Sequence, residues 1–148
     1  MDIKHHTHPD SLERYSFWWS EARLIVAAVA LISGGVPPIF FITPYPLLSI
    51  AVLGLKIAWL ISGLVSAYLI YRWYNGGKVF GGKDITDVLA FWVMVVSGIN
   101  LGLTSVLGQN PGMTIASGRT IFFVVGIIYV VTAAYLYHRW RAHGKKMF

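Results

Sequence analysis

The amino-acid sequence predicts an all-α membrane protein with four transmembrane helices, on the strength of three observations. First, 56% of its 148 residues are apolar and only 12% are charged, about half the charged share of an ordinary soluble domain. Second, the charged residues avoid four apolar runs of about 20 residues each, the length that crosses a bilayer core of about 30 Å. Third, these runs lack the polar outer face of a soluble helical bundle.

The four runs define the expected domain organisation. We expect a transmembrane domain over residues 23–141, with spans at about 23–43, 47–71, 87–107 and 120–140. Residues 142–148 are expected to form a basic cytoplasmic tail. Residues 1–22 are polar and aromatic and have no small-residue cleavage site, so no removable signal peptide is expected.

The N-terminal segment, residues 1–22, is expected to carry a short interfacial helix. Asp10 and Glu13 have capping-box spacing. Apolar and aromatic residues follow at helical spacing: Leu12, Tyr15, Trp18, Trp19 and Ala22. The pattern is typical of an amphipathic helix on the membrane surface. The alternative is that Trp18 and Trp19 belong to the aromatic belt of the first span.

The first span contains the motif SGGVPP, from Ser33 to Pro38. Its prolines remove two backbone donors and its glycines add backbone freedom, so a kink or break is predicted there. A broken helix can line a binding site in a transporter, whereas a tolerated kink is a packing detail. The sequence leaves both alternatives open.

Small residues predict where helices pack closely. The second span has one every four residues, and the third has a GxxxG pair. These expected packing residues are Gly54, Ala58, Ser62, Ser66, Gly98 and Gly102. The pattern does not say whether the partner helix lies in the same chain.

Two segments resemble each other and predict an internal repeat. SAYLIYRWY, at 66–74, and AAYLYHRWR, at 133–141, are identical at five of nine positions. Upstream, Ser33-Gly34 and Ser97-Gly98 lie at similar distances before them. Two helical hairpins in parallel orientation would give this pattern. The alternative is convergence, because any helix that ends at the inner interface favours aromatic and basic residues.

Basic residues predict the orientation of the chain. Ten of them fall on one expected side: Lys4, Arg14, Arg23, Arg72, Lys78, Lys83, Arg139, Arg141, Lys145 and Lys146. Arg119 and Lys56 fall on the other. We therefore expect a multi-pass protein of the cell membrane, plasma or inner, with both termini cytoplasmic. The net charge of +6 favours contact with anionic lipids over nucleic acid, for which no basic domain is available.

The segment GGKVFGGKD, from Gly76 to Asp84, has the G-x-x-x-x-G-K spacing of a phosphate-binding loop. A nucleotide site is excluded, because a membrane helix replaces the required strand and Asp84 stands where Ser or Thr would hold magnesium. Asp84 and Thr86 are expected instead to cap the third span. A lipid phosphate could still bind at Lys78, Lys83, Arg72 and Arg139, with a plain solvated turn as the alternative.

The third span carries the most polar face, formed by Ser97, Asn100 and Thr104. These side chains either make hydrogen bonds between helices or line a polar path. Lys56 is the remaining candidate for a functional charge within the membrane. It either snorkels to the outer surface or contributes its charge to the same path.

Other chemistry is absent from the sequence. There is no cysteine, so thiol catalysis and thiolate metal sites are excluded. Every carboxylate and histidine is expected on the cytoplasmic side, and His138 has no partner for a bis-histidine haem. We expect no enzyme, no metal and no cofactor. The predicted function is a non-enzymatic membrane subunit or scaffold, in a homo-oligomer or a larger complex, acting through helix–helix and anionic-lipid contacts. The alternative is a small homo-oligomeric transporter or channel with its path on the third span.

Overall fold

The computed structural model describes residues 9–82 and 84–148 and contains helices but no strand over these residues. Four helices are long and apolar enough to cross a membrane, so the chain is an all-helical, multi-pass membrane protein. The long helices are α2 (Pro9–Ile32), α4 (Leu48–Gly76), α5 (Ile85–Leu107) and α7 (Arg119–Ala142). Three short elements connect them: α3 (Ile39–Ile42), the 3-10 turn η1 (Tyr45–Leu47) and α6 (Pro111–Ile115).

Helix α2 differs most from expectation. It runs without interruption from Pro9 to Ile32, so the segment expected as a separate interfacial helix is its first half. The run 23–43 divides between the end of α2, a turn and α3. Gly34 and Gly35 adopt φ of 91° and 89°, and the two prolines that follow cannot continue the helix. The predicted break is therefore confirmed, but as the end of the span.

The ends of the other long helices follow local chemistry. The Oδ1 atom of Asp84 accepts a 2.8 Å hydrogen bond from the Thr86 amide and caps α5, as predicted. Gly77 and Gly108 adopt left-handed conformations that end α4 and α5. Helix α4 extends five residues beyond the expected 71 before it reaches its glycine.

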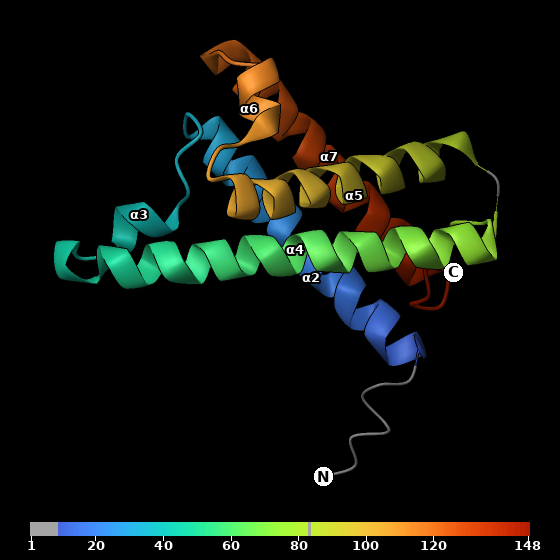
Figure 1. Ribbon diagram of the computed structural model, residues 1–148. Coiled ribbons are helices and arrows are strands. Elements are labelled where there is room, and N and C mark those ends of the chain that lie inside the picture. The colour runs from blue at the N-terminus through green and yellow to red at the C-terminus, as the bar shows by residue number, and fades with distance from the viewer. Residues whose placement is uncertain (1–8, 83) are drawn as a thin grey trace, which may run out of the picture.

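The four long helices form two crossing pairs. Helix α4 packs mainly on α5, and α2 packs mainly on α7 (Figure 1). Glycines permit both close approaches. A Cβ atom on Gly102 would lie 2.7 Å from the Cα atom of Gly63, and one on Gly126 would lie 2.7 Å from Ile32. The closest packing is therefore between the two halves of the sequence.

One end of the bundle carries two ion pairs with a buried carboxylate, Glu13 with Arg72 at 2.7 Å and Asp87 with Arg139 at 2.5 Å. We call this the ion-pair end. Two aromatic contacts join the halves there, Phe17 with Trp140 at 4.9 Å between ring centroids and Phe91 with Trp73 at 6.1 Å. Each half thus supplies a carboxylate for its own arginine and a phenylalanine for the tryptophan of the other half.

The C-terminal residues complete the ion-pair end. Met147 is fully buried, and its amide donates a 2.8 Å hydrogen bond to the Glu13 carboxylate. The Phe80 amide donates to the Met147 carbonyl at 2.7 Å. The segment expected as a basic tail therefore folds back onto α2 at Met147.

Candidate binding cavity

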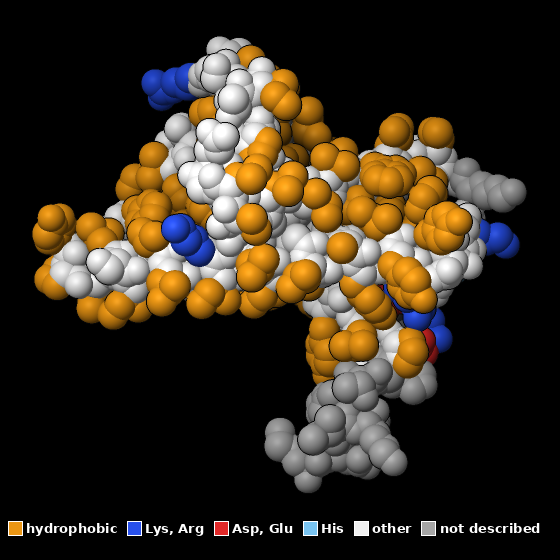
Figure 2. All heavy atoms as spheres, in the orientation of Figure 1, with side chains coloured by type: hydrophobic (Ala, Val, Ile, Leu, Met, Phe, Trp, Pro, Cys, Tyr) orange, Lys and Arg blue, Asp and Glu red, His pale blue; other side chains and the backbone are white. Residues whose placement is uncertain are grey.

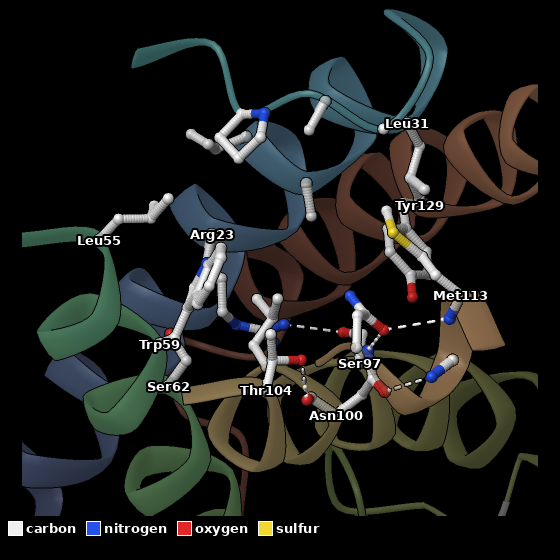
Figure 3. Close-up of a pocket in the computed structure, with 18 of the residues that line it drawn as sticks. Arg23, Leu31, Leu55, Trp59, Ser62, Ser97, Asn100, Thr104, Met113 and Tyr129 are labelled. Carbon is white, nitrogen blue, oxygen red and sulfur yellow. Dashed lines mark hydrogen bonds between the residues drawn. The ribbon is translucent and has the colours of Figure 1, made fainter. Parts of the chain in front are cut away.

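A cavity of about 620 Å³ lies between α2, α4, α5, α6 and α7, away from the ion-pair end (Figure 3). Most of its wall is apolar, with contributions from four long helices. Representative wall residues are Val26, Leu31, Leu55, Trp59, Ile121 and Val125. Polar atoms enter the wall at a few points only, and the chemistry of the cavity depends on them.

Arg23 is the only charged residue in this wall among the residues that the structure describes. Its side chain leaves α2 and crosses to α5, where Nη1 donates to Ser97 Oγ and Nη2 donates to the Met94 carbonyl, both at 2.8 Å (Figure 3). The residue is 8% exposed. Within residues 9–82 and 84–148, its Nε atom has no hydrogen-bond partner and its guanidinium makes no ion pair.

Gly98 makes room for this arginine. A Cβ atom at that position would lie 3.1 Å from Cζ of Arg23 and would collide with Oγ of Ser66. Ser97, one residue earlier, both accepts from Arg23 and donates to the Met94 carbonyl at 2.8 Å. The GxxxG pair on α5 therefore admits a side chain at Gly98 and a helix backbone at Gly102.

Asn100 fastens the loop at the other side of the cavity. Its Nδ2 atom donates to Oδ1 of Asn110 at 2.9 Å, and its Oδ1 atom accepts from the Gly112 amide at 2.8 Å. The Asn110 side chain also caps α6 by accepting from the Met113 amide at 3.1 Å. Thr104 donates only to the Asn100 carbonyl. The polar face of α5 thus makes internal hydrogen bonds and also lines the cavity.

The expected small-residue ladder on α4 divides in two. Ser62 and Ser66 are buried against neighbouring helices, and Ser62 Oγ accepts a 3.1 Å hydrogen bond from the Trp19 indole. Ala58 lines the cavity, and Gly54 is exposed with nothing within 4 Å of an added Cβ. Gly63, which the ladder did not include, makes the closest backbone contact of α4.

The remaining predicted residues lie away from the cavity. Lys56 is exposed, and its backbone carbonyl accepts from Ser105 Oγ at 2.9 Å. Arg72 and Arg139 are each held by a carboxylate, and Lys78 is exposed. Lys83 lies outside the described residues.

Arg23 is the residue that sequence reasoning missed, because the first span was expected to begin there. The capping signal at Asp10 and Glu13 marks the start of a helix, and the SGGVPP motif marks its end. Reading one helix between these two signals would have put Arg23 inside it. Its contacts with α5 could not be read from the sequence.

Comparison of the chain with protein-family models, with curated proteins and with solved structures finds no match. Function is therefore argued from the geometry alone. Over the described parts of the chain, no three His, Asp or Glu side chains gather where they could hold a metal ion.

Proposed function

We propose that the protein is a non-enzymatic integral membrane subunit or scaffold that acts through helix–helix and anionic-lipid contacts. The observation that carries the proposal is the exposed apolar face of α4. Only Ala51, Ser62, Ser66 and Leu69 of its 29 residues are buried. The first half of α4 projects from the bundle (Figure 1), and hydrophobic side chains cover it (Figure 2).

Six of the exposed large hydrophobic side chains of α4 have a regular spacing; Val52, Ile61 and Tyr74 are also exposed. The six follow steps of three, four, three, four and seven residues, at Ile50, Leu53, Ile57, Leu60, Leu64 and Tyr71. We call this set the α4 stripe. An average of 3.5 residues per turn is the spacing with which two helices pack as a left-handed coiled coil. The lipid-facing side of a helix also recurs at helical spacing, and the stripe presents one continuous apolar face that a partner helix could cover.

The partner we propose is a second copy of this chain. The small-residue face of α4 is already used by α5 in the same chain, through Gly63 and Ser66, so the stripe is a separate surface. Two copies related by two-fold symmetry would bring the stripe against itself, and this is the commonest symmetry of homo-oligomers. A larger membrane complex would use the same surface on another protein.

Anionic lipid is the second proposed partner. Exposed cations lie near the ion-pair end: Lys78, Arg141, Lys145 and Lys146. Such clusters bind the negative cytoplasmic leaflet, in keeping with the proposed orientation with both termini cytoplasmic. Arg72 and Arg139 contribute less to lipid binding, because each pairs with a buried carboxylate, whereas Lys146 pairs only with the exposed Asp10 at 3.6 Å.

We also propose that the two halves arose as repeats. The same 74 residues separate Glu13 from Asp87 and Phe17 from Phe91, and 67 residues separate Arg72 from Arg139. Gly34 and Gly108, which end the first helix of each half with positive φ, also lie 74 apart. This register differs from the one that matched Gly34 with Gly98. Equivalent contacts at equivalent positions are harder to obtain by convergence than similar helix ends.

A cysteine cross-linking experiment tests the scaffold proposal. The chain has no cysteine, so single substitutions report alone. Leu53→Cys lies on the stripe and Val131→Cys lies on α7, and the two parent side chains are 60% and 62% exposed. We expect Leu53→Cys to give a cross-linked dimer in membranes and Val131→Cys to remain monomeric. Equal cross-linking of both, or of neither, would remove the stripe as the interface.

A transporter or channel remains the second candidate, and the cavity favours it. Arg23, Asn100 and Thr104 come from two helices and line one space. Flux of ions and small solutes through proteoliposomes tests this candidate. Robust wild-type flux that is lost in Asn100→Ala, with unfolding temperature kept, would favour transport. Lys56 is not in the cavity wall, so Lys56→Gln serves as the charge control.

A further inference from the structure

We propose that the cavity binds an anionic amphiphile, with a single carboxylate or phosphate headgroup against Arg23 and an apolar chain along the surrounding wall. This site is separate from the exposed lysines and from the α4 stripe. It does not depend on the scaffold proposal.

The position of Arg23 makes a counter-ion necessary. It lies fourteen residues after the start of α2 and nine before its end, which corresponds to roughly 21 Å and 14 Å along the helix axis. An arginine at this depth of a spanning helix is costly unless a partner offsets its charge. Among the described residues, the guanidinium donates hydrogen bonds to a hydroxyl and a carbonyl group, which are neutral acceptors.

Among the described residues, no carboxylate forms an ion pair with Arg23. The three ion pairs over residues 9–82 and 84–148 involve Glu13, Asp87 and Asp10. Glu21 is buried two residues away on the same helix and interacts with the charge of Arg23, but side chains two apart on a helix do not face each other and the two form no ion pair. A buried cation left without a partner is strongly unfavourable. A bound anionic group in the cavity would supply the direct counter-ion that Arg23 lacks.

Arg23 also has donors to offer. A guanidinium carries five N–H groups, and its two hydrogen bonds to α5 occupy two of them. The Nε atom also lacks a partner among the described residues, but protein atoms enclose it, so the donors left for a ligand are the second N–H groups of Nη1 and Nη2. Carboxylate and phosphate oxygens are the acceptors that match this planar set of donors. The contacts with Ser97 and Met94 hold the guanidinium in place for such a group.

The volume and the apolar wall of the cavity indicate the chemistry of the rest of the ligand. Its volume of about 620 Å³ falls in the range of about 300–1,000 Å³ typical of small-molecule sites. The wall beyond Arg23 is apolar, with Val26, Leu55 and Ile121 among its residues. Asn100 and Asn110 already bond to each other, so they create little demand for a second polar group. A chain with one charged end fits, whereas a sugar or a cation does not.

Three probes with one chain and different headgroups test the assignment: hexadecanoate, hexadecyl phosphate and hexadecanol. Native mass spectrometry of the protein in a non-ionic detergent would report how much of each is bound. We expect the two anions to bind at least tenfold more tightly than the neutral alcohol. The tighter of the two anions, and the mass of any ligand retained through purification, would identify the source as a carboxylate or a lipid phosphate.

Three variants locate the site. Arg23→Gln removes the charge and should lower anion binding at least tenfold, towards the level of the alcohol. Arg14→Gln removes an exposed charge of the same helix and should leave binding unchanged. Ala30→Phe fills the wall of the cavity without changing charge and should weaken all three probes. It keeps the test valid if Arg23→Gln does not fold.

The outcomes are decisive in both directions. Equal binding of all three probes, binding of none, or unchanged anion binding in Arg23→Gln or Ala30→Phe would overturn the assignment. Loss in Arg14→Gln equal to that in Arg23→Gln would assign binding to the surface instead. The same spectra report the oligomeric state, so failure of the ligand proposal is distinguishable from failure of the scaffold proposal.

Discussion

The ion-pair end and the Arg23 cavity differ in how their arginines are partnered. At the ion-pair end, Arg72 and Arg139 are partly exposed, and each meets a buried carboxylate of the same chain. In the cavity, Arg23 meets two neutral acceptors and borders about 620 Å³ of open volume. The first arrangement is complete in itself and serves stability. The second lacks an ion-pair partner, and a charged residue without one inside a membrane helix indicates a ligand site.

The largest expected difference between the ion-pair end and the cavity is the loss of unfolding free energy when a packed side chain is truncated. Phe17→Ala removes a fully buried ring that stacks on Trp140, so we expect a loss of about 3–5 kcal/mol. Val26→Ala at the cavity wall borders open space and should lose less than about 1.5 kcal/mol. Thermal and denaturant unfolding in detergent would measure both. Similar losses would contradict the view that only the ion-pair end is solidly packed.

Glycine substitutions should give the next largest difference. Gly102→Leu forces a side chain against the backbone of Gly63 on α4, and we expect a loss of about 1–3 kcal/mol or failure to fold. Gly54→Leu enters open space and should leave the unfolding temperature within a few degrees of wild type. If the two variants unfold alike, the close α4–α5 contact is wrong.

Asn100→Ala should have the smallest of these effects. It removes the hydrogen bonds that fasten Asn110 and the Gly112 amide, so we expect a loss of about 0.6–2 kcal/mol. Hydrogen exchange at the α6 amides should rise, because the loop loses its anchor. Thr104→Val removes a bond to its own helix only and is the control. Unchanged exchange in α6 would show that Asn100 does not hold the loop.

Much of the architecture could be predicted from the sequence, because length and apolarity determine where helices can cross a bilayer. The break after Ile32 and the Asp84 cap followed from local chemistry. A helix start near Asp10 was predicted, but its continuity with the first span was not, because polar residues such as Glu13 obtain partners from α4 and from the C-terminal segment. These partners are 59 or more residues away, and composition does not reveal them.

The candidate site was only half predictable. The polar face of Ser97, Asn100 and Thr104 followed from helical spacing alone. The partner of Ser97 did not, because α2 and α5 meet only in the folded chain. The packing residue Gly63 was missed because the predicted ladder took every fourth residue of α4, which selected Ser62 and Ser66 and passed over Gly63.

The measurement that tests the contrast between the two regions most directly is stabilisation by ligand. Wild type, Arg23→Gln and Arg72→Gln would be unfolded with and without the tighter of the two anionic probes. At a concentration of 100 times the dissociation constant, binding should stabilise wild type by about 2.7 kcal/mol. Arg72→Gln should be less stable without ligand but should keep that increment, whereas Arg23→Gln should lose it. An equal increment in wild type and Arg23→Gln would contradict the assignment of Arg23 as the ligand's counter-ion.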